Sequence, residues 1–264
     1  MLLRSLGSGV SGLKNFQTYL DVIGNNISNV STTGFKKGRV NFQDTFSQSM
    51  QGAEATRNAI QIGNGSQTSA IDNIVTGGPI NSTGNPYDLA ISGEGYFKVQ
   101  DASGAIYYTR AGDFHLTDAK ELVNSQGLRL LGTGNTPIPA IPDDVQSFTI
   151  AKDGTITILH DDNTTTTLAQ LELAAFNNPA GLEKAGNSLY KQSSASGAPI
   201  GINNTSTPAL GASTYIQQSA LESSNVDLTD EMTALIEAQR AYQANARTIT
   251  TADQILQELV QLKR

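Results

Sequence analysis

Residues 13–30 read LKNFQTYLDVIGNNISNV and carry an apolar residue at every seventh position. A second apolar set follows the first at a distance of three residues. The two sets are Leu6, Leu13, Leu20 and Ile27, and then Phe16, Ile23 and Val30. This heptad spacing places the side chains on one face of an α-helix and is typical of a coiled-coil partner. The sequence therefore predicts an N-terminal helix with one narrow apolar stripe.

The C-terminal region carries the same pattern. Apolar residues recur there at seven-residue spacing, again with a second set three residues further on. The positions are Leu228, Leu235, Tyr242, Ile249 and Leu256, together with Ala238, Ala252 and Leu259. Asp227 precedes the run and is well placed to cap a helix, and the acidic residues Asp230 and Glu231 fall in the first turn, where the helix dipole favours them. We expect a second long helix with one apolar stripe.

Both stripes must be buried, and the sequence leaves two ways open. The two helices can pair as a hairpin within one molecule, or the stripes can be covered by neighbouring molecules in a polymer. We assign all of these stripe positions to a candidate polymer interface.

The region between the stripes has a different pattern. Residues 34–72 are predicted to form an extended connecting segment, because Gln, Ser, Asn, Gly and Thr dominate most of it. Residues 73–220 contain short alternating apolar runs, with a hairpin signal at Asp153-Gly154 and a tight turn expected at Gly93-Glu94-Gly95. The expected fold class is α+β, with helical arms at residues 1–33 and 221–264 that pack in a coiled-coil-like manner, and a β-rich body at residues 73–220.

Composition and charge exclude several classes of protein. The 264-residue chain has a net charge of −7 and a pI of about 4.8, which argues against sequence-independent binding to nucleic acid or anionic lipid. It contains no cysteine, so disulfides, thiolate zinc sites and thiol nucleophiles are excluded. No apolar run approaches the roughly 20 residues needed to span a bilayer, so we expect no membrane insertion.

Motifs for catalysis are missing from the sequence as well. His115 and His160 do not stand at a metal-ligand spacing, and neither a phosphate-binding loop nor a nucleophile elbow occurs. We therefore expect no cofactor, no metal and no enzymatic activity. The short basic cluster of Lys36, Lys37 and Arg39 is interpreted as a solvated face or the rim of an interface. The glycine-interrupted N-terminus does not read as a cleavable signal peptide.

Several stretches resemble bacterial flagellar rod and hook proteins. The run from Leu20 to Lys36, which includes Asn25, Asn26, Asn29, Gly34, Phe35 and Lys36, is similar to the N-terminal signature of this family. Asp88 to Ile91, Gly95 to Phe97 and Tyr108 to Arg110 resemble its β-domain motif. The stretches that contain Asn225 and Asp227, and then Gln239 and Arg240, resemble its closing helix. The motifs occur in the family's order and span nearly the whole chain.

The resemblance implies a non-enzymatic subunit of a helical tube that transmits motor torque from rod to filament. It is stronger to the short hook proteins of Gram-positive bacteria, with the distal rod protein as the alternative and a non-polymerising cap or binding module as a third class. The implied partners are further copies of the chain, axial proteins of the rod and the hook–filament junction, the hook cap and the flagellar type III export apparatus. The implied location is the flagellum, outside the cytoplasm.

Overall fold

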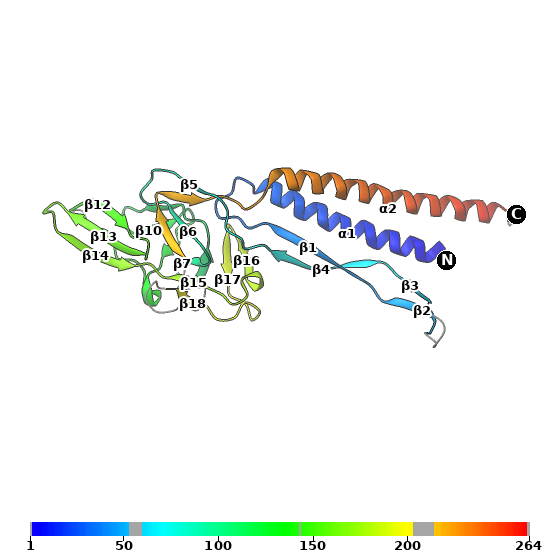
Figure 1. The fold of residues 1–264 in the computed structure, drawn as a ribbon, viewed down its shortest axis with the longest axis horizontal. Helices are drawn as coiled ribbons and strands as arrows, with labels where there is room; N and C mark the ends of the chain where they lie inside the picture. The colour runs from blue at the N-terminus through cyan, green and yellow to red at the C-terminus, as the bar shows by residue number, and fades with distance from the viewer. Residues whose placement is uncertain (1, 53–59, 143, 203–213, 263–264) are drawn as a thin grey trace. The chain divides into compact units, whose positions relative to one another are not determined.

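The structure, a computed structural model, describes residues 2–52, 60–142, 144–202 and 214–262. The chain divides into two compact units (Figure 1). Unit 1 is formed by Met1–Ser28, Gly38–Ile74 and Val226–Arg264, and unit 2 by Asn29–Lys37 and Val75–Asn225. Unit 1 therefore joins the two ends of the chain, whereas unit 2 comes mainly from its middle.

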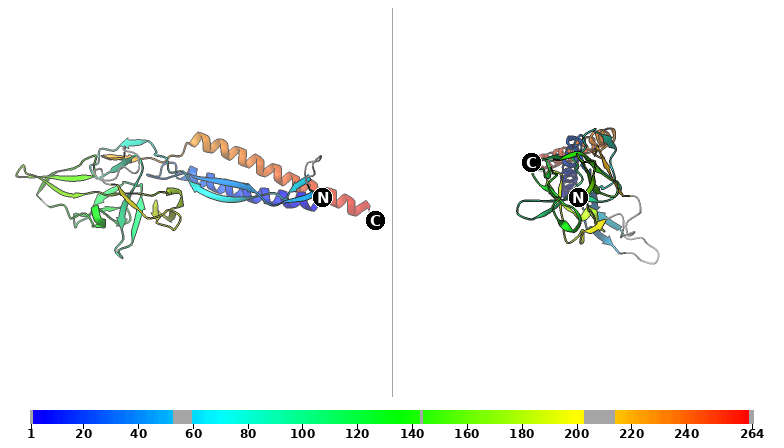
Figure 2. Two further views of the ribbon diagram at one scale, coloured as in Figure 1. Left: turned by 60° about the horizontal axis from the view of Figure 1, so that its bottom comes forward. Right: turned by 90° about the vertical axis from the view of Figure 1, so that its left-hand side faces the viewer.

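Within the described residues, unit 1 consists of helices α1 and α2 and a β ribbon (Figure 2). Its elements are α1 (Leu2–Ser28), β1 (Gly38–Asp44), β2 (Ser47–Gln51), β3 (Ile60–Gly63), β4 (Ser66–Asn73) and α2 (Leu228–Leu262). The ribbon is antiparallel throughout, since β1 pairs with β4 and β2 pairs with β3. Phe42 of β1 contacts Phe16 and Tyr19 of α1, with ring centroids 6.2 and 5.9 Å apart, so the ribbon packs on that helix.

Helices α1 and α2 lie side by side in one subunit (Figures 1 and 2). Glycines of α1 allow this approach. A β-carbon on Gly12 would lie 2.8 Å from Nδ2 of Asn245, and one on Gly9 would lie 3.2 Å from Cγ1 of Ile249. Glycine disfavours an isolated helix, so α1 combines low intrinsic helicity with a close partner. The coiled-coil-like geometry expected for this pair stays a prediction.

Unit 2 is built from short strands and two 3₁₀ turns in its described residues. The elements up to the middle of unit 2 are β5 (Ile80–Ser82), β6 (Leu89–Ser92), β7 (Tyr96–Gln100), β8 (Ile106–Thr109), β9 (Phe114–Leu116), β10 (Leu122–Asn124), β11 (Arg129–Leu130), η1 (Thr133–Asn135), β12 (Val145–Ile150) and β13 (Thr155–His160). They are followed by β14 (Thr165–Gln170), β15 (Leu173–Ala175), η2 (Pro179–Gly181), β16 (Glu183–Gly186), β17 (Leu189–Lys191), β18 (Ile200–Ile202), β19 (Tyr215–Gln218) and β20 (Ala220–Glu222).

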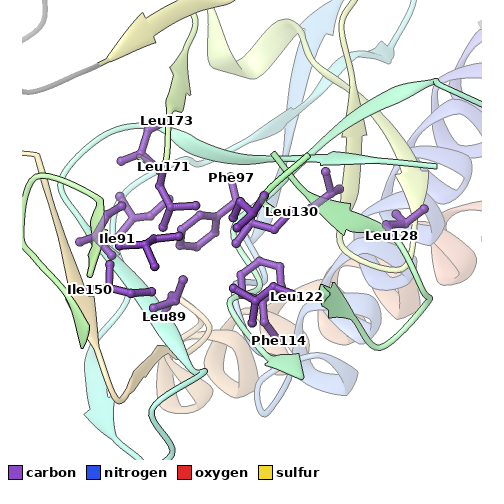
Figure 3. Close-up of a cluster of buried hydrophobic side chains, with 14 of the residues drawn as sticks. Leu89, Ile91, Phe97, Phe114, Leu122, Leu128, Leu130, Ile150, Leu171 and Leu173 are labelled. Atoms are coloured by element: carbon purple, nitrogen blue, oxygen red, sulfur yellow. The ribbon is translucent and has the colours of Figure 1, made fainter. Parts of the chain in front are cut away.

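The largest sheet of the described part of unit 2 has the order β16-β17-β8-β7-β11-β10-β9, with β15 pairing both β7 and β18. Strands β12, β13 and β14 form a separate sheet, and β6 pairs with β19 and β5 with β20. Apolar side chains from several of these strands form a buried cluster that includes Phe97, Phe114 and Leu130 and is shown in Figure 3. The rings of Phe97 and Phe114 meet edge to face at 5.5 Å, a geometry that aromatic pairs favour.

Several local predictions are confirmed. Helices flank a β-rich middle, Asp153-Gly154 closes the β12–β13 hairpin, and Gly93 and Gly95 form the turn between β6 and β7 with φ of 110° and 131°. Oδ1 of Asp227 accepts the N–H groups of Thr229 at 2.8 Å and Asp230 at 3.4 Å, as an N-cap does.

Candidate functional site

The stripe positions predicted from the heptads lie at different depths in unit 1. Ile23, Ala238 and Ala252 are buried, whereas Leu228 and Tyr242 are exposed. The half-buried positions are Leu6, Leu13, Phe16, Leu20, Ile27, Leu235, Ile249 and Leu256. The pairing of α1 with α2 thus accounts for part of the stripe within a single molecule.

Two stripe positions are not placed on a helix face in this way. Val30 lies beyond the end of α1, in a turn where the N–H of Thr32 donates to the carbonyl of Asn29 at 3.1 Å. The heptad pattern therefore extends to Val30, beyond the end of α1, because Asn29 accepts a turn hydrogen bond instead of continuing the helix. Leu259 belongs to α2, but its side chain is outside the described residues.

A row of exposed apolar side chains runs along the first half of α2. Leu228, Met232 and Ile236 stand four residues apart and are 41%, 50% and 52% exposed. Residues at this spacing share one face of a helix, so α2 carries an uncovered apolar surface within the subunit. The heptad template identified Leu228 alone, and an i, i+4 reading from Leu228 would have found the other two. We call these three residues the α2 row.

Asn26 explains one part of the N-terminal motif. Its side chain is buried in unit 1, where Nδ2 donates to the carbonyl of Gly38 at 2.9 Å and to Oε2 of Glu231 at 3.1 Å. Its Oδ1 accepts the N–H of Gly38 at 2.9 Å. One amide therefore ties α1, the start of β1 and the first turn of α2 together. The other motif residues of unit 1 are exposed, and they are Asn25, Asp227, Gln239 and Arg240.

Lys36 of the N-terminal motif and Arg110 of the β-domain motif meet at a buried carboxylate in unit 2. Oε1 of Glu222 accepts Nζ of Lys36 at 2.5 Å and the N–H of Gly78 at 2.9 Å, and Oε2 accepts Nη1 of Arg110 at 3.0 Å. The side chains of Lys36, Glu222 and Arg110 are 0%, 0% and 1% exposed. Nζ of Lys36 also donates to the carbonyl of Thr76 at 2.8 Å. We call Lys36, Arg110 and Glu222 the buried triad.

Further hydrogen bonds and contacts surround the buried triad. Gly34 has a φ of +66°, and its N–H donates to the carbonyl of Glu222 at 2.8 Å. Oδ1 of Asn225 accepts the N–H of Lys37 at 2.8 Å, and Nδ2 of Asn225 donates to Oγ1 of Thr76 at 3.1 Å. Phe35 is half-buried, and Nζ of Lys184 lies 5.2 Å from the centre of its ring. Residues far apart in the sequence therefore meet at one place.

The interpretation of Lys36 as part of a solvated basic face is wrong. Its ammonium group is enclosed, and burial lowers the pKa of Lys36, with the Arg110 charge acting in the same direction and Glu222 opposing both. Two cations share one carboxylate, so removing Glu222 would leave buried charge uncompensated, a situation that typically costs about 3–5 kcal/mol.

Glu222 was not identified from the sequence. Its sequence neighbours Leu221 and Ser223 carry no charge, and its two charged partners lie 186 and 112 residues away. One signal was available, because Glu222 is the single charged residue between Lys191 and Asp227. Glu222 stands two residues before the predicted closing-helix motif, in a long uncharged stretch. If such a charge is buried, it needs a hydrogen-bonded partner of opposite charge.

Next to the triad lies a group of buried aromatic rings. Cζ of Arg110 lies 5.5 Å from the ring centre of Tyr96, whose ring is 5.6 Å from that of Tyr190. Burial raises the pKa of Tyr96 and raises that of Tyr190 to about 12. Both phenols therefore stay protonated in the folded unit at neutral pH, and ionisation is easier after unfolding.

This difference predicts a loss of stability at alkaline pH. A tyrosine in an unfolded chain has a pKa near 10. The protonated phenol of Tyr190 therefore makes its full contribution to the stability of unit 2 below pH ~10, and this contribution is lost as the pH rises towards about 12. Two pKa units correspond to about 2–3 kcal/mol. Urea unfolding between pH 8 and 11.5 should show a smaller alkaline loss in Tyr190→Phe than in the wild type. The exposed Tyr215→Phe serves as the control, and equal slopes in all three proteins would contradict the prediction.

Neither α1 nor α2 is long and apolar enough, over its described residues, to cross a membrane. Across the described part of the whole chain, His, Cys, Asp and Glu side chains do not gather in groups of three or more that could hold a metal ion.

Family profiles match three regions of the chain. Residues 6–36 match "Flagella basal body rod protein", residues 90–158 match "Flagellar hook protein FlgE/F/G D1 domain", and residues 217–262 match "Flagellar basal body rod FlgEFG protein C-terminal". The first region contains most of α1, the last contains α2, and the middle region lies in unit 2.

Relatives of full length agree with these matches. The chain is 46% identical to the flagellar basal-body rod protein FlgG of Bacillus subtilis, with 100% of both chains covered. It is 41% identical to FlgG of Agrobacterium fabrum, covering 96% of this chain and 97% of that protein. It is 27% identical to the flagellar hook protein FlgE of Borreliella burgdorferi, in an alignment of 446 residues. This chain belongs to the flagellar rod and hook protein family, the axial proteins of the bacterial flagellum.

Proposed function

We propose that the protein is a structural subunit of the distal rod of the flagellar basal body. The observation that carries this proposal is the full-length identity of 46% to a basal-body rod protein FlgG. FlgG relatives align with this chain over 262–271 residues, whereas the alignment with the hook protein extends over 446 residues. The hook, which the sequence motifs favoured, becomes the second candidate.

The motifs could not separate rod from hook for a simple reason. They lie in α1, in the β-rich unit and in α2, the same regions that the profiles for rod and hook proteins match. These regions carry the fold that both kinds of axial protein share. Chain length and overall identity are the features that differ, and both favour the rod.

We propose that copies of the chain assemble through unit 1. The α2 row leaves apolar side chains uncovered within one subunit, and contiguous exposed apolar surface on a soluble protein commonly marks an interface. A contact between two different surfaces repeats without limit when its rotation does not close, which yields a helical filament. The predicted stripe positions that remain half-buried would complete their burial in that filament.

The proposal includes location and partners. The subunit would have no enzymatic activity, would leave the cytoplasm through the flagellar type III export apparatus, and would contact other axial proteins of the rod and hook. Membership of the family and the absence of catalytic motifs in the sequence support these points.

Complementation in cells tests the rod against the hook. Expression of this chain should restore basal bodies with complete rods, and motility, in cells that lack FlgG. It should not restore hooks in cells that lack FlgE. The reverse result would assign the protein to the hook, and soluble protein that forms no polymer under any condition would favour a cap or binding module.

A substitution in the α2 row tests the interface. Ile236→Asp should leave the monomer stable, because the side chain is 52% exposed. It should abolish rod assembly and motility, because a carboxylate in a dry apolar contact costs several kcal/mol per subunit. Electron microscopy of basal bodies provides the measurement. Thr251→Asp, at an exposed polar position of α2, is the matched control, and assembly by Ile236→Asp equal to that of Thr251→Asp would remove the α2 row from the interface.

A further inference from the structure

The chain passes between the two units four times. Unit 2 receives the segment Asn29–Lys37, which is connected to unit 1 at both ends, and the long segment Val75–Asn225, which is also connected to unit 1 at both ends. Any force that one unit exerts on the other through the covalent chain therefore enters unit 2 at residues 29–37, at residues just after Val75 or at residues just before Asn225. We call these the three crossing segments.

The crossing segments are joined to one another inside unit 2. Residues 80–82 and 220–222 pair as β5 and β20, and the N–H of Ser223 donates to the carbonyl of Pro79 at 2.9 Å. Segment 29–37 joins both of them, because Lys36 donates to Thr76 and to Glu222. Asn225 repeats the same pattern with Lys37 and Thr76. All three segments thus meet at the Glu222 carboxylate and the Asn225 amide.

The same carboxylate joins the crossing segments to the main sheet. Arg110 directly follows β8, a strand that pairs with β7 and β17 inside the large sheet. Its Nη1 donates to Glu222 at 3.0 Å and its Nη2 donates to the carbonyl of Gly93 at 2.7 Å. Hydrogen bonds between charged groups that water cannot reach are the strong ones. Glu222 is therefore a group through which displacement of any of the three crossing segments reaches the sheet.

We propose that Glu222, supported by Asn225, couples the three crossing segments so that they move as one with the main sheet and share any torque that passes between the two units. Without this coupling, force would act on one segment at a time, and pairs of short strands such as β5 and β20 would separate one after another. The proposal rests on the proposed function as a torque-transmitting axial subunit, but the coupling itself is a property of the monomer. Glu222 holds the three crossing segments in position relative to one another.

Hydrogen exchange of the full-length monomer tests the coupling. In Glu222→Gln, the amides of Gly34, Lys37, Gly78 and Asn225 should exchange about tenfold faster or more, all by a similar factor, because charge-assisted hydrogen bonds are lost. Glu172→Gln is the matched control. Glu172 is largely buried and pairs with Lys98 of the main sheet at 3.0 Å, away from the crossing segments. In this control the same amides should change by less than about threefold.

A second variant covers the case in which Glu222→Gln does not fold. Asn225→Ala removes the bonds to Lys37 and Thr76 and leaves every buried charge paired. It should accelerate exchange in segment 29–37 and around Thr76 together, by about threefold to tenfold. Acceleration confined to one segment, or equal acceleration in the Glu172→Gln control, would overturn the proposal.

Motility under load separates this inference from the proposed function. Asn225→Ala cells should build rods and swim normally in dilute medium, and should lose swimming in viscous medium in which Glu172→Gln cells still swim. Equal swimming of the two variants in viscous medium would overturn the role in torque transfer. Failure of the wild-type chain to restore rods would instead reject the proposed function, and the exchange experiment would still decide the coupling.

Discussion

Gly34→Ala is expected to lower the free energy of unfolding of unit 2 by about 3 kcal/mol or more, a value reached by the most damaging single substitutions. Gly34 has a φ of +66°, and a β-carbon there would lie 2.5 Å from the carbonyl carbon of Arg110 and 2.6 Å from the nitrogen of Ala111. Both neighbours are backbone atoms, which cannot rotate away. The new methyl group would push apart the segments that Glu222 and Arg110 hold together.

Urea unfolding of the variant measures this effect, and a second glycine provides the control. Gly84 has a φ of +74°, but among the described residues no heavy atom other than those of Gly84 and its two chain neighbours lies within 4 Å of the position of its β-carbon. Gly84→Ala therefore carries the conformational cost alone, about 1–2 kcal/mol. If both variants lost the same amount, the close contact between Gly34 and the Arg110 backbone would not exist in solution.

Ile23→Asp is expected to separate the helices of unit 1. Ile23 is 1% exposed, so the substitution removes buried apolar volume and places a carboxylate in its position, at a combined cost of about 4 kcal/mol or more. Circular dichroism at 222 nm should show a large loss of helix, while the unfolding transition of unit 2 stays where it is.

Ile236→Asp is the matched control for this experiment, because it makes the same chemical change at a half-exposed position of the same unit. Its helical signal should match the wild type, and its stability should change by no more than about 0.5 kcal/mol. A helical signal for Ile23→Asp as strong as that of Ile236→Asp would mean that the α1–α2 pair does not form in the monomer.

Local patterns predicted the local structure well. The heptads located both helices, because a seven-residue apolar repeat lines up side chains on one face of a helix and on no face of a strand. Asp153-Gly154 located a hairpin because its turn needs a positive φ. The β ribbon of residues 38–73 was described in the sequence only as an extended segment. Its strand β1 buries one side chain, Val40, and a strand that covers a helix with so few apolar residues gives almost no alternating signal.

The candidate sites depend on contacts that no local pattern records. The buried triad is held by pairings between residues more than 100 positions apart, and Lys36 reads in the sequence as one of several surface cations. The α2 row was missed for a different reason. A heptad template selects the side of α2 that meets one partner, whereas Met232 and Ile236 lie on a side that needs a second partner. The boundaries predicted at residues 33, 72 and 220 stay predictions.

Unit 1 also sets the order in which the chain can fold. Its helices come from opposite ends of the sequence, so α1 can pair with α2 only when residues 228–262 have emerged. Closing a loop of about 200 residues costs entropy that no local contact offsets, and folding rates fall as contacts become more distant. Gly9 and Gly12 weaken α1 on its own. The α1–α2 pair therefore forms late in synthesis, and a chain that leaves a channel N-terminus first would complete this unit only after α2 has emerged.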